Sequence, residues 1–170
     1  MDSSRTIYLV GMMGAGKTTV GKKLAKLLDR RFVDIDRQIC ESTGVTIATI
    51  FEIEGEDGFR KRESDALALL GESKNLVVAC GGGIILAPTN RARLSCGVVV
   101  YLHADVELLY NRTKRDNSRP LLDVSDPQQR IACLLRRRDP LYREVADIVV
   151  ESSLGPGKTA SGVQQALEEA

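Results

Sequence analysis

Short apolar runs recur along the chain, separated by longer segments in which apolar residues recur at helical spacing. The runs are rich in β-branched residues and apolar at consecutive positions, which is typical of strands buried on both faces of a sheet. Strands that alternate with helices predict βαβ units and a mostly parallel sheet. The runs are IYLV at 7–10, FVDI at 32–35, LVVA at 76–79, VVVYL at 98–102 and DIVV at 147–150.

The clearest predicted helix is KTTVGKKLAKLL at 17–28. Its apolar positions are Val20, Leu24, Leu27 and Leu28, and lysines lie on the opposite face. This spacing predicts an amphipathic helix that buries one stripe against the sheet. Two further helices are predicted around glycine stops, which end helices because glycine tolerates the left-handed conformation. They cover 46–55, ending at Gly55, and 56–71, ending at Gly71.

A later helix is predicted over 125–138, with Asp126 as its N-cap and Pro127 at the first helical position. We expect Pro140 to break or kink this helix, because proline lacks the amide hydrogen that helix interiors need. Arg138 would then sit at the bend. A last, short helix is expected from about Thr159 to the end of the chain.

The stretch at about 111–126, NRTKRDNSRPLLDVSD, is charged and has almost no periodic apolar pattern. We interpret it as a long exposed loop, which in a compact domain is often a functional lid.

Residues 11–18, GMMGAGKT, fit the pattern G-x-x-x-x-G-K-[ST] between the first predicted strand and the first predicted helix. In this context the glycines let backbone N–H groups converge on phosphate oxygens at a helix N-terminus, which carries partial positive charge. Lys17 then supplies a point charge for the β- and γ-phosphates, and the Thr18 hydroxyl is a ligand for Mg²⁺. The similar GPGKT at 155–159 has no strand-to-helix context, and we expect it to be a loop.

Two polar segments follow neighbouring predicted strands, where ligands of open α/β sheets bind. Asp34 and Asp36 share one face if their strand continues; one could hold Mg²⁺ waters and the other accept a proton. The alternative is that an aspartate caps the next helix. The glycines at 81–83 form either a tight turn with positive φ or a surface where a polar substrate meets backbone amides.

The chain has 170 residues, a net charge of +1 and no apolar run near the roughly 18 residues of a membrane helix. These values predict one domain over 1–170, without a nucleic-acid or membrane partner. The four cysteines form no CxxC pair, so reduced thiols are expected rather than a zinc site. The N-terminus resembles neither a signal nor a transit peptide, and we expect a cytoplasmic protein.

A phosphate-binding loop alone does not separate kinases from GTPases and ATPases. No guanine-reading N-K-x-D sequence is present, and a small domain with a basic lid favours a kinase for a small metabolite or nucleotide. The chain is rich in arginine, and its residue types alone do not choose among Arg136, Arg137 and Arg138, or between Arg60 and Arg62. Alternatives are a kinase for gluconate or a nucleoside monophosphate, and a non-catalytic relative.

At this point nearly the whole chain resembles the shikimate kinase family. The resemblance implies a P-loop NTPase fold of the nucleoside monophosphate kinase type: a five-stranded parallel sheet flanked by helices, a substrate-binding region at about 34–63 and a mobile lid. It rests on GMMGAGKTTVG at the start, D-x-D at 34–36, GEDGFRKRE at 55–63, GGG at 81–83, RPLL at 119–122 and RRDPLYREVAD at 137–147.

The resemblance implies transfer of the γ-phosphoryl group of ATP to the 3-hydroxyl of shikimate, with Mg²⁺, in a cytoplasmic enzyme that is a monomer. It implies catalytic roles for Lys17, Asp36 and Arg119, with Asp36 as the candidate base. Thr18 would ligate the metal, and Asp34 would reach it through water. The implied nucleotide-binding residues are Gly14, Ala15, Gly16, Lys17, Thr18, Thr19, Arg112, Arg119 and, less firmly grounded, Pro156. The implied shikimate-binding residues are Asp36, Arg60, Gly81, Gly82, Gly83 and Arg138.

Overall fold

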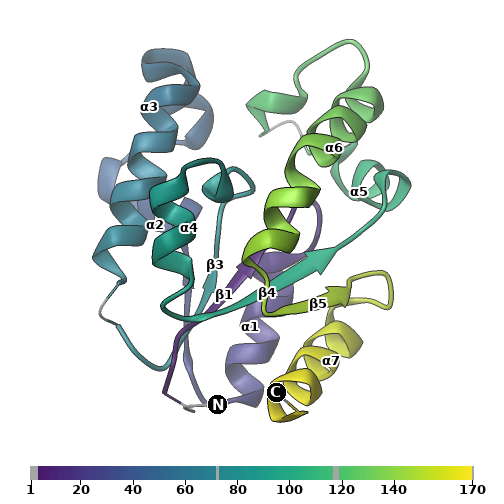
Figure 1. The fold of residues 1–170 in the computed structure, drawn as a ribbon. Coiled ribbons are helices and arrows are strands. Elements are labelled where there is room, and N and C mark those ends of the chain that lie inside the picture. Colours follow the sequence, from purple (N-terminus) through teal and green to yellow (C-terminus); the bar gives the residue numbers. More distant parts are fainter. Residues whose placement is uncertain (1–3, 72, 117–118, 170) are drawn as a thin grey trace.

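The computed structural model describes residues 4–71, 73–116 and 119–169. Within these residues, the strands form a five-stranded parallel sheet in the order β2-β3-β1-β4-β5 (Figure 1). This arrangement confirms the predicted parallel α/β sheet. The strands are β1 Ile7–Val10, β2 Arg31–Asp34, β3 Leu76–Ala79, β4 Val98–His103 and β5 Ile148–Glu151.

Helices cover both faces of this sheet. Figure 1 shows α1 and α7 lying together on one side, while α6 crosses the other side. The helices are α1 Lys17–Leu27, α2 Ile35–Thr43, α3 Ile47–Leu69, α4 Pro88–Leu94, α5 Val106–Thr113, α6 Pro127–Val145 and α7 Pro156–Glu169, with 3₁₀ turns η1 Ile84–Leu86 and η2 Pro120–Leu122. Among the helices of the described segments, none is both long and apolar enough to cross a lipid bilayer.

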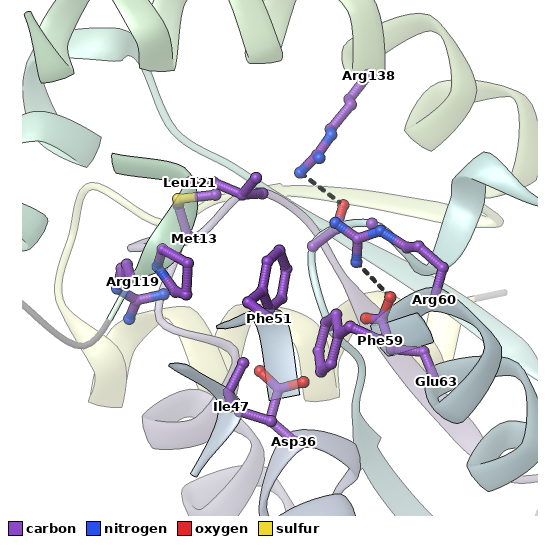
Figure 2. A pocket seen from close by; sticks show the side chains of 14 residues that line it. Met13, Asp36, Ile47, Phe51, Phe59, Arg60, Glu63, Arg119, Leu121 and Arg138 are labelled. Carbon is purple, nitrogen blue, oxygen red and sulfur yellow. Dashed lines mark hydrogen bonds and ion pairs between the residues drawn. The ribbon is translucent and has the colours of Figure 1, made fainter. Parts of the chain in front are cut away.

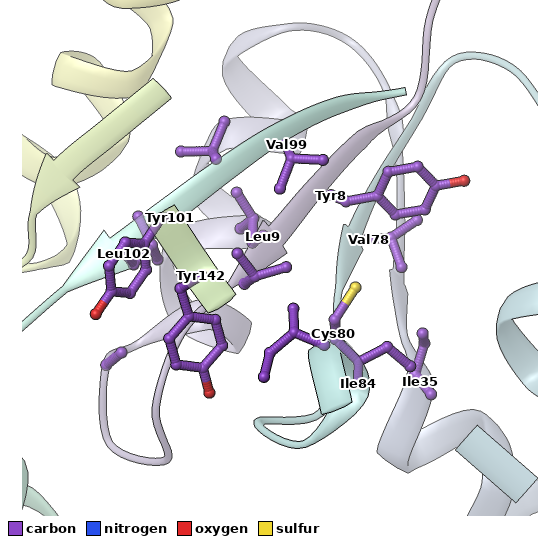
Figure 3. Close-up of a cluster of buried hydrophobic side chains, with 14 of the residues drawn as sticks. Tyr8, Leu9, Ile35, Val78, Cys80, Ile84, Val99, Tyr101, Leu102 and Tyr142 are labelled. Atoms are coloured by element: carbon purple, nitrogen blue, oxygen red, sulfur yellow. The ribbon is translucent and has the colours of Figure 1, made fainter. Parts of the chain in front are cut away.

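The core lies between the sheet and these helices. Strands β1 and β3 are buried at every position, as expected for strands covered on both faces. Figure 3 shows side chains of these strands packed with Ile35 from α2, Ile84 from η1 and Tyr142 from α6. The aromatic ring of Tyr101 in β4 stacks on that of Tyr142, with centroids 4.9 Å apart. Helix α6 is therefore fixed against the sheet by its aromatic face.

Several predicted helix boundaries are confirmed by local chemistry. The side chain of Asp126 accepts a hydrogen bond from the Gln129 amide at 2.9 Å and caps α6, with Pro127 as its first residue. Gly55 has φ 71° and ψ −176°, so it divides α3 into the two predicted helices. In α1, Val20 and Leu24 are buried as predicted.

Other predictions about the helices were wrong. Leu27 is 50% exposed and does not belong to the buried stripe of α1. Helix α6 continues through Pro140 to Val145, so of the two predicted outcomes, a break or a kink, the break is excluded. Its residues on both sides of the proline are held by burial, since Arg138 and Tyr142 lie on the same inner face. Packing of that face outweighs the hydrogen bond that proline removes.

The loops also differ from the sequence interpretation. Helix α5 extends to Thr113, so the start of the predicted lid, including Arg112, is helical. The lid positions 117–118 lie outside the described residues. Helix α7 begins at Pro156, earlier than expected, so most of the GPGKT segment is helical rather than a loop. Gly155, with φ 86°, supplies the turn before it.

The topology places the candidate site. Strands β1 and β3 are adjacent in the sheet. After β1 the chain runs toward β2 at one edge of the sheet, whereas after β3 it runs in the opposite direction, toward β4. A crevice forms at the carboxyl ends of strands where the connections diverge in this way. The phosphate-binding loop follows β1, and the three glycines follow β3. Both polar segments therefore meet at one switch point.

Candidate active site

The loop between β1 and α1 has the conformation that phosphate binding requires. Gly14 and Gly16 have φ values of 82° and 92°, which side-chain-bearing residues rarely adopt. A Cβ on Gly14 would also meet Thr113 of α5, so this helix packs directly on the loop. The amides of Gly14, Ala15, Gly16, Lys17, Thr18 and Thr19 lie in the loop and in the first turn of α1. They form a helix N-terminus suited to an anion.

Lys17 lies at the centre of this loop. Its Nζ donates hydrogen bonds to the carbonyl oxygens of Gly11 at 2.7 Å and Met12 at 2.9 Å. Burial lowers the pKa of the Lys17 ammonium to about 8, and the nearby Asp36 carboxyl partly opposes this shift. The charged amine is therefore held within the loop and lies beside the second group of polar residues.

Asp34 ends β2 and contacts the first helix. Its Oδ2 accepts a hydrogen bond from the Thr18 hydroxyl at 2.6 Å, and its Oδ1 accepts one from the Arg37 amide at 3.2 Å. Asp34 is thus the N-cap of α2, which confirms the capping alternative for this residue. The neighbouring hydroxyl and carboxylate oxygens are the hard ligands that Mg²⁺ prefers. This donor set fits a magnesium ion held by Thr18 directly and by Asp34 through water.

Asp36 does not share a strand face with Asp34, because β2 ends at Asp34 and Asp36 lies in the first turn of α2. The condition for a shared strand face, a strand that continues past Asp34, is therefore not met. Burial and the neighbouring Asp34 carboxylate raise the pKa of Asp36. Within the described chain, its buried Oδ1 has no hydrogen-bond partner. Since buried polar atoms are nearly always paired, this oxygen is available to a ligand hydroxyl.

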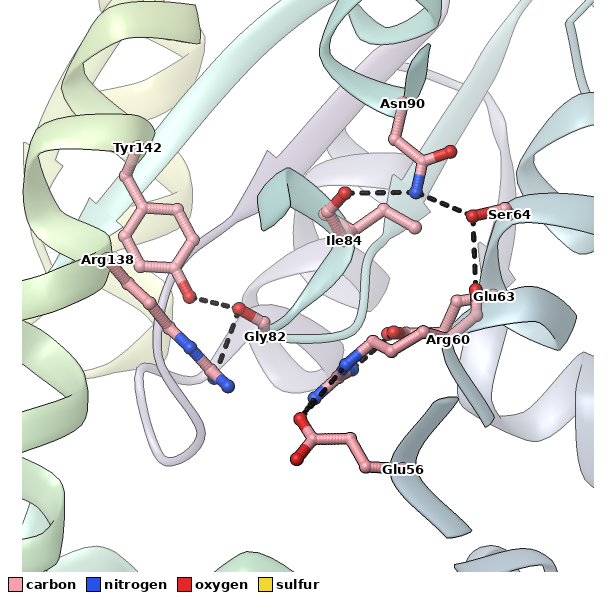
Figure 4. A network of polar contacts seen from close by, with 9 residues as sticks. All are labelled: Glu56, Arg60, Glu63, Ser64, Gly82, Ile84, Asn90, Arg138 and Tyr142. Carbon is pink, nitrogen blue, oxygen red and sulfur yellow. Dashed lines mark hydrogen bonds and ion pairs between the residues drawn. The ribbon is translucent and has the colours of Figure 1, made fainter. Parts of the chain in front are cut away.

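Arg60 is held on α3 by two glutamates. Its Nη2 contacts Glu56 Oε1 at 2.9 Å, and its Nη1 pairs with Glu63 Oε2 (Figure 4). Glu63 is fully buried, and desolvation raises the pKa of its carboxyl to about 7. Arg62 instead pairs with Glu54 at 2.6 Å, away from the cavities described below. Of these two arginines, only Arg60 therefore lines a cavity.

The glycines at 81–83 make room for these side chains. None of the three has a positive φ, so the predicted left-handed conformation is absent, although the Ile84 amide donates to the Gly81 carbonyl and closes a turn. A Cβ on Gly81 would overlap Glu63 Oε1, and a Cβ on Gly83 would overlap the Arg60 guanidinium. The absence of side chains after β3 is thus explained by the close approach of α3. Backbone amides and the ends of two α3 side chains share this space.

Arg138 reaches the same place from the opposite side. Only 3% of this residue is exposed, and its Nη1 donates to the Gly82 carbonyl at 3.3 Å. Arg136 and Arg137 lie on the exposed side of α6. Of the three arginines, Arg138 is therefore the one whose side chain is buried near the glycines. Figure 2 shows Arg60 and Arg138 converging from α3 and α6.

Two adjoining cavities contain these groups. The acceptor cavity, of about 270 Å³, is lined by Arg60, Glu63, Arg138 and the three glycines. The phosphate cavity, of about 310 Å³, is lined by the loop after β1 together with Asp34 and Arg112. Residues common to both are Met13, Asp36, Gly81, Gly82 and Arg119. A group bound in one cavity would therefore adjoin a group bound in the other at Asp36.

Two arginines flank the phosphate cavity. Arg112 donates to the carbonyl oxygens of Gly14 at 3.1 Å and Ser152 at 2.7 Å, which ties α5 to the loop before α7. Arg119 pairs with Asp116 at 2.7 Å. Both line the cavity, whereas Pro156, the first residue of α7, lines neither cavity.

Sequence reasoning assigned no role to Glu63 or to the apolar wall of the acceptor cavity. This wall contains Ile47, Phe51, Phe59 and Leu121 (Figure 2). The rings of Phe51 and Phe59 lie 4.9 Å apart. Ile47, Phe51 and Phe59 are apolar positions of predicted helices, and Leu121 lies in the predicted lid. Only the three-dimensional arrangement shows that they form one wall. For Glu63 the available signal was its place three residues after Arg60, at contact distance on a helix.

The fold and the two joined cavities define a P-loop kinase that acts on a small molecule. Residues 13–168 match the family model described as shikimate kinase. Shikimate kinase of Aromatoleum aromaticum is 54% identical over 164 residues, which cover 95% of this chain and 94% of that protein. For shikimate kinase of Dechloromonas aromatica the identity is 54% over 168 residues, covering 98% and 90%.

The structure of shikimate kinase from Acinetobacter baumannii in complex with shikimate has a TM-score of 0.95 to this chain. Its sequence is 50% identical, and the match covers 98% of this chain and 94% of that one. The chain belongs to the shikimate kinase family. The resemblance inferred from the sequence motifs is therefore confirmed.

Proposed function

We propose that this protein transfers the γ-phosphoryl group of ATP to the 3-hydroxyl of shikimate, giving shikimate 3-phosphate and ADP. The observation that carries this proposal is the meeting of two cavities at Asp36. One cavity contains the phosphate-binding loop, and the other contains Arg60 and Arg138. A phosphoryl donor and a carboxylate-bearing acceptor would then bind on the two sides of one carboxyl group.

The nucleotide would bind along the phosphate cavity. The amides of Gly14 to Thr19 and the Lys17 ammonium would hold the β- and γ-phosphates. Arg119 would add charge at the transferring group, and Arg112 and Pro156 would lie on the adenosine side. Thr18 and Asp34 would hold Mg²⁺ with the phosphates, and that ion would neutralise charge as it develops on them. Within the described segments no three acidic, cysteine or histidine side chains cluster, so the phosphates would complete the coordination.

The acceptor would be oriented by its carboxylate. Two guanidinium groups form forked hydrogen bonds to a planar anion, which suits Arg60 and Arg138. The backbone of Gly81, Gly82 and Gly83, together with Asp36, would meet the ring hydroxyls. The side chains of Phe51 and Phe59 would cover the apolar edge of the shikimate ring.

Asp36 would then accept the proton of the attacking hydroxyl. The hydroxyl oxygen forms a bond to the γ-phosphorus while the bond to the β–γ bridging oxygen breaks, and ADP leaves with that oxygen. A base works best when its pKa lies near the working pH. The raised pKa of Asp36 moves in that direction.

The proposal is tested by measuring ADP release from ATP with no acceptor, shikimate, gluconate or AMP. Stimulation by shikimate alone is expected. The Lys17→Ala variant, checked for folding by circular dichroism, should lose most of this turnover. Stimulation by gluconate or AMP instead would overturn the assignment of the acceptor. No stimulation of a protein that still binds ATP would favour a non-catalytic relative.

We further propose that the protein acts as a monomer in the cytoplasm. The four cysteines are free, and they are spread over different elements, which suits a reducing compartment. The residues that line the two cavities, the phosphate loop, Asp36, Arg60 and Arg138 among them, supply every charged group that the proposed reaction uses, so the reaction needs no residue from a second copy. Light scattering should therefore give the mass of one 18.6 kDa chain. A stable dimer at assay concentration would contradict this proposal.

A further inference from the structure

The carbonyl oxygen of Gly82 is held differently from those of its neighbours. The Gly81 carbonyl accepts from the Ile84 amide at 3.1 Å, and the Gly83 carbonyl accepts from the Leu86 amide at 3.0 Å. These are bonds within the turn itself. The Gly82 carbonyl instead accepts from two side chains of α6, the Tyr142 hydroxyl and the Arg138 guanidinium (Figure 4).

This contact matters because the Gly82 carbonyl takes no part in the hydrogen bonds of the turn itself. Glycines contribute no side-chain packing and have the largest conformational freedom of any residue. The orientation of the Gly82 peptide therefore depends on another element. Among the side chains of the described residues, only Tyr142 and Arg138 form hydrogen bonds to the Gly82 backbone.

The surroundings of Tyr142 hold its hydroxyl in a fixed position. The residue is fully buried, and its ring stacks on Tyr101 with an interplanar angle of 25°. Burial raises the pKa of its phenol, so the hydroxyl remains a neutral donor at physiological pH. The ring is not part of the lining of the acceptor cavity. Tyr142 therefore acts on that cavity through the Gly82 carbonyl and through the neighbouring Arg138 guanidinium, which partly opposes the rise in the pKa of the phenol.

Arg138 shares the same carbonyl. Tyr142 lies four residues after Arg138, so the two side chains project from the same face of α6. The Arg138 bond, at 3.3 Å, is long for a charge-assisted hydrogen bond. With the Tyr142 hydroxyl satisfying the carbonyl, the guanidinium keeps donors for a ligand. Without that hydroxyl, Arg138 would be the remaining donor to a buried carbonyl.

We propose that Tyr142 is a positioning residue of the acceptor site, which fixes the Gly82 backbone and leaves the Arg138 guanidinium free to bind the acceptor carboxylate. This inference rests on the proposed function, because shikimate is the acceptor used to test it. Loss of the Tyr142 hydroxyl should weaken acceptor binding more than nucleotide binding. Gly82 lines both cavities, but Arg138 lines only the acceptor cavity.

The test compares Tyr142→Phe with Tyr101→Phe. Tyr101 is the stacking partner of Tyr142, and its hydroxyl donates to Asp139 Oδ1 at 2.8 Å, outside both cavities. Each variant loses one buried hydroxyl from the same ring pair. In Tyr142→Phe, KM for shikimate should rise about 3- to 10-fold, the range expected for one hydrogen bond. KM for ATP should stay within about twofold of the wild-type value in both variants.

Calorimetric titration of shikimate into each variant without ATP provides a second measurement, and the melting temperature reports any general loss of stability. A Tyr142→Phe variant with unchanged shikimate KM and Kd would overturn the inference. So would an equal rise of both KM values, or the same shikimate effect in Tyr101→Phe. Wild-type protein that neither binds nor phosphorylates shikimate would overturn the proposed function, and this inference with it.

Discussion

Two carboxyl groups, the half-buried Asp36 and the fully buried Glu63, have raised pKa values for the same main reason, loss of solvent. Each has one buried oxygen without a partner within the described chain. The other oxygen of Glu63 is paired with Arg60, so this carboxyl group holds the arginine in place. Asp36 lines both cavities, whereas Glu63 lines the acceptor cavity alone. This position makes Asp36 the group that can take a proton from a bound acceptor.

This difference predicts the effect of Asp36→Asn. The amide has nearly the same shape but is a very poor base, so kcat should fall by about 10²- to 10⁴-fold. Steady-state kinetics with shikimate and ATP measure this change. The conservative replacement should leave KM for ATP close to the wild-type value. A rise in shikimate KM with unchanged kcat would instead make Asp36 a binding group only.

At the scale of elements, the site is assembled from the ends of β1, β2 and β3 and from the inner faces of α3 and α6. The apolar runs predicted the strands, and the glycine pattern predicted the phosphate loop, because these signals are local. Of the two outcomes predicted at Pro140, a break or a kink, the break is absent, because the inner face of α6 is buried on both sides of the proline. Asp34 and Asp36 share no strand face, because Asp34 ends the strand and caps α2. The first outcome depends on packing against another element, and a local pattern does not contain that information.

The sequence left two reasons open for the glycines at 81–83, a turn with positive φ or a surface where a substrate meets backbone amides. None of the three has a positive φ, and the side chains of Arg60 and Glu63 from α3 also approach this segment closely. Such a contact joins residues about twenty apart in the chain. Likewise, choosing Arg138 over its two neighbours required the burial of one face of α6. Residue types predicted the chemistry of the site, and the helix faces determined which residues supply it.

The close approach of α3 predicts the effect of Gly83→Ala. A Cβ at this position would overlap the Arg60 guanidinium, so that side chain must move out of the acceptor cavity. Shikimate KM should rise at least about tenfold, as expected when one charged hydrogen-bonding partner is lost. Kinetics of both substrates provide the measurement.

The matched control is Gly162→Ala in α7. A Cβ there would meet only Val150 Cγ1, at 3.9 Å, and alanine favours helix, so activity should be unchanged and stability equal or higher. If Gly83→Ala kept the wild-type shikimate KM, Arg60 would not depend on the glycine for its place.

At the scale of the whole molecule, the charged groups of the site lower the free energy of unfolding. Several charged groups lie together where the cavities meet, and some of them are largely removed from water. Lys17, Asp36 and Glu63 all have pKa values shifted toward their neutral forms. Each shift means that the charged form costs free energy in the folded state. Binding of phosphate and carboxylate groups would supply the missing partners.

Glu63 gives the clearest consequence for global stability. Its pKa is about 7 in the folded protein and 4.5 in its ordinary state. Between these values the unfolded chain has released the proton while the folded protein retains it, so stability falls as pH rises. The shift already includes the opposing effects of Arg60 and Arg138, which lower the pKa, and of Asp36, which raises it. Above pH 7 the carboxylate is charged in both states, and the loss of stability is complete.

We therefore expect Glu63→Gln to change the pH dependence of unfolding. Relative to wild type, the variant should gain stability between pH 5 and pH 8 by up to about 3 kcal/mol, since one unit of pKa corresponds to about 1.4 kcal/mol. Urea unfolding of both proteins across this range measures the difference. The control is Glu52→Gln, an exposed position on the same helix, whose free energy of unfolding should stay within about 0.5 kcal/mol of wild type. If the Glu63→Gln and wild-type curves ran parallel, Glu63 would ionise alike in the folded and unfolded protein, and the pairing with Arg60 would fully offset its burial.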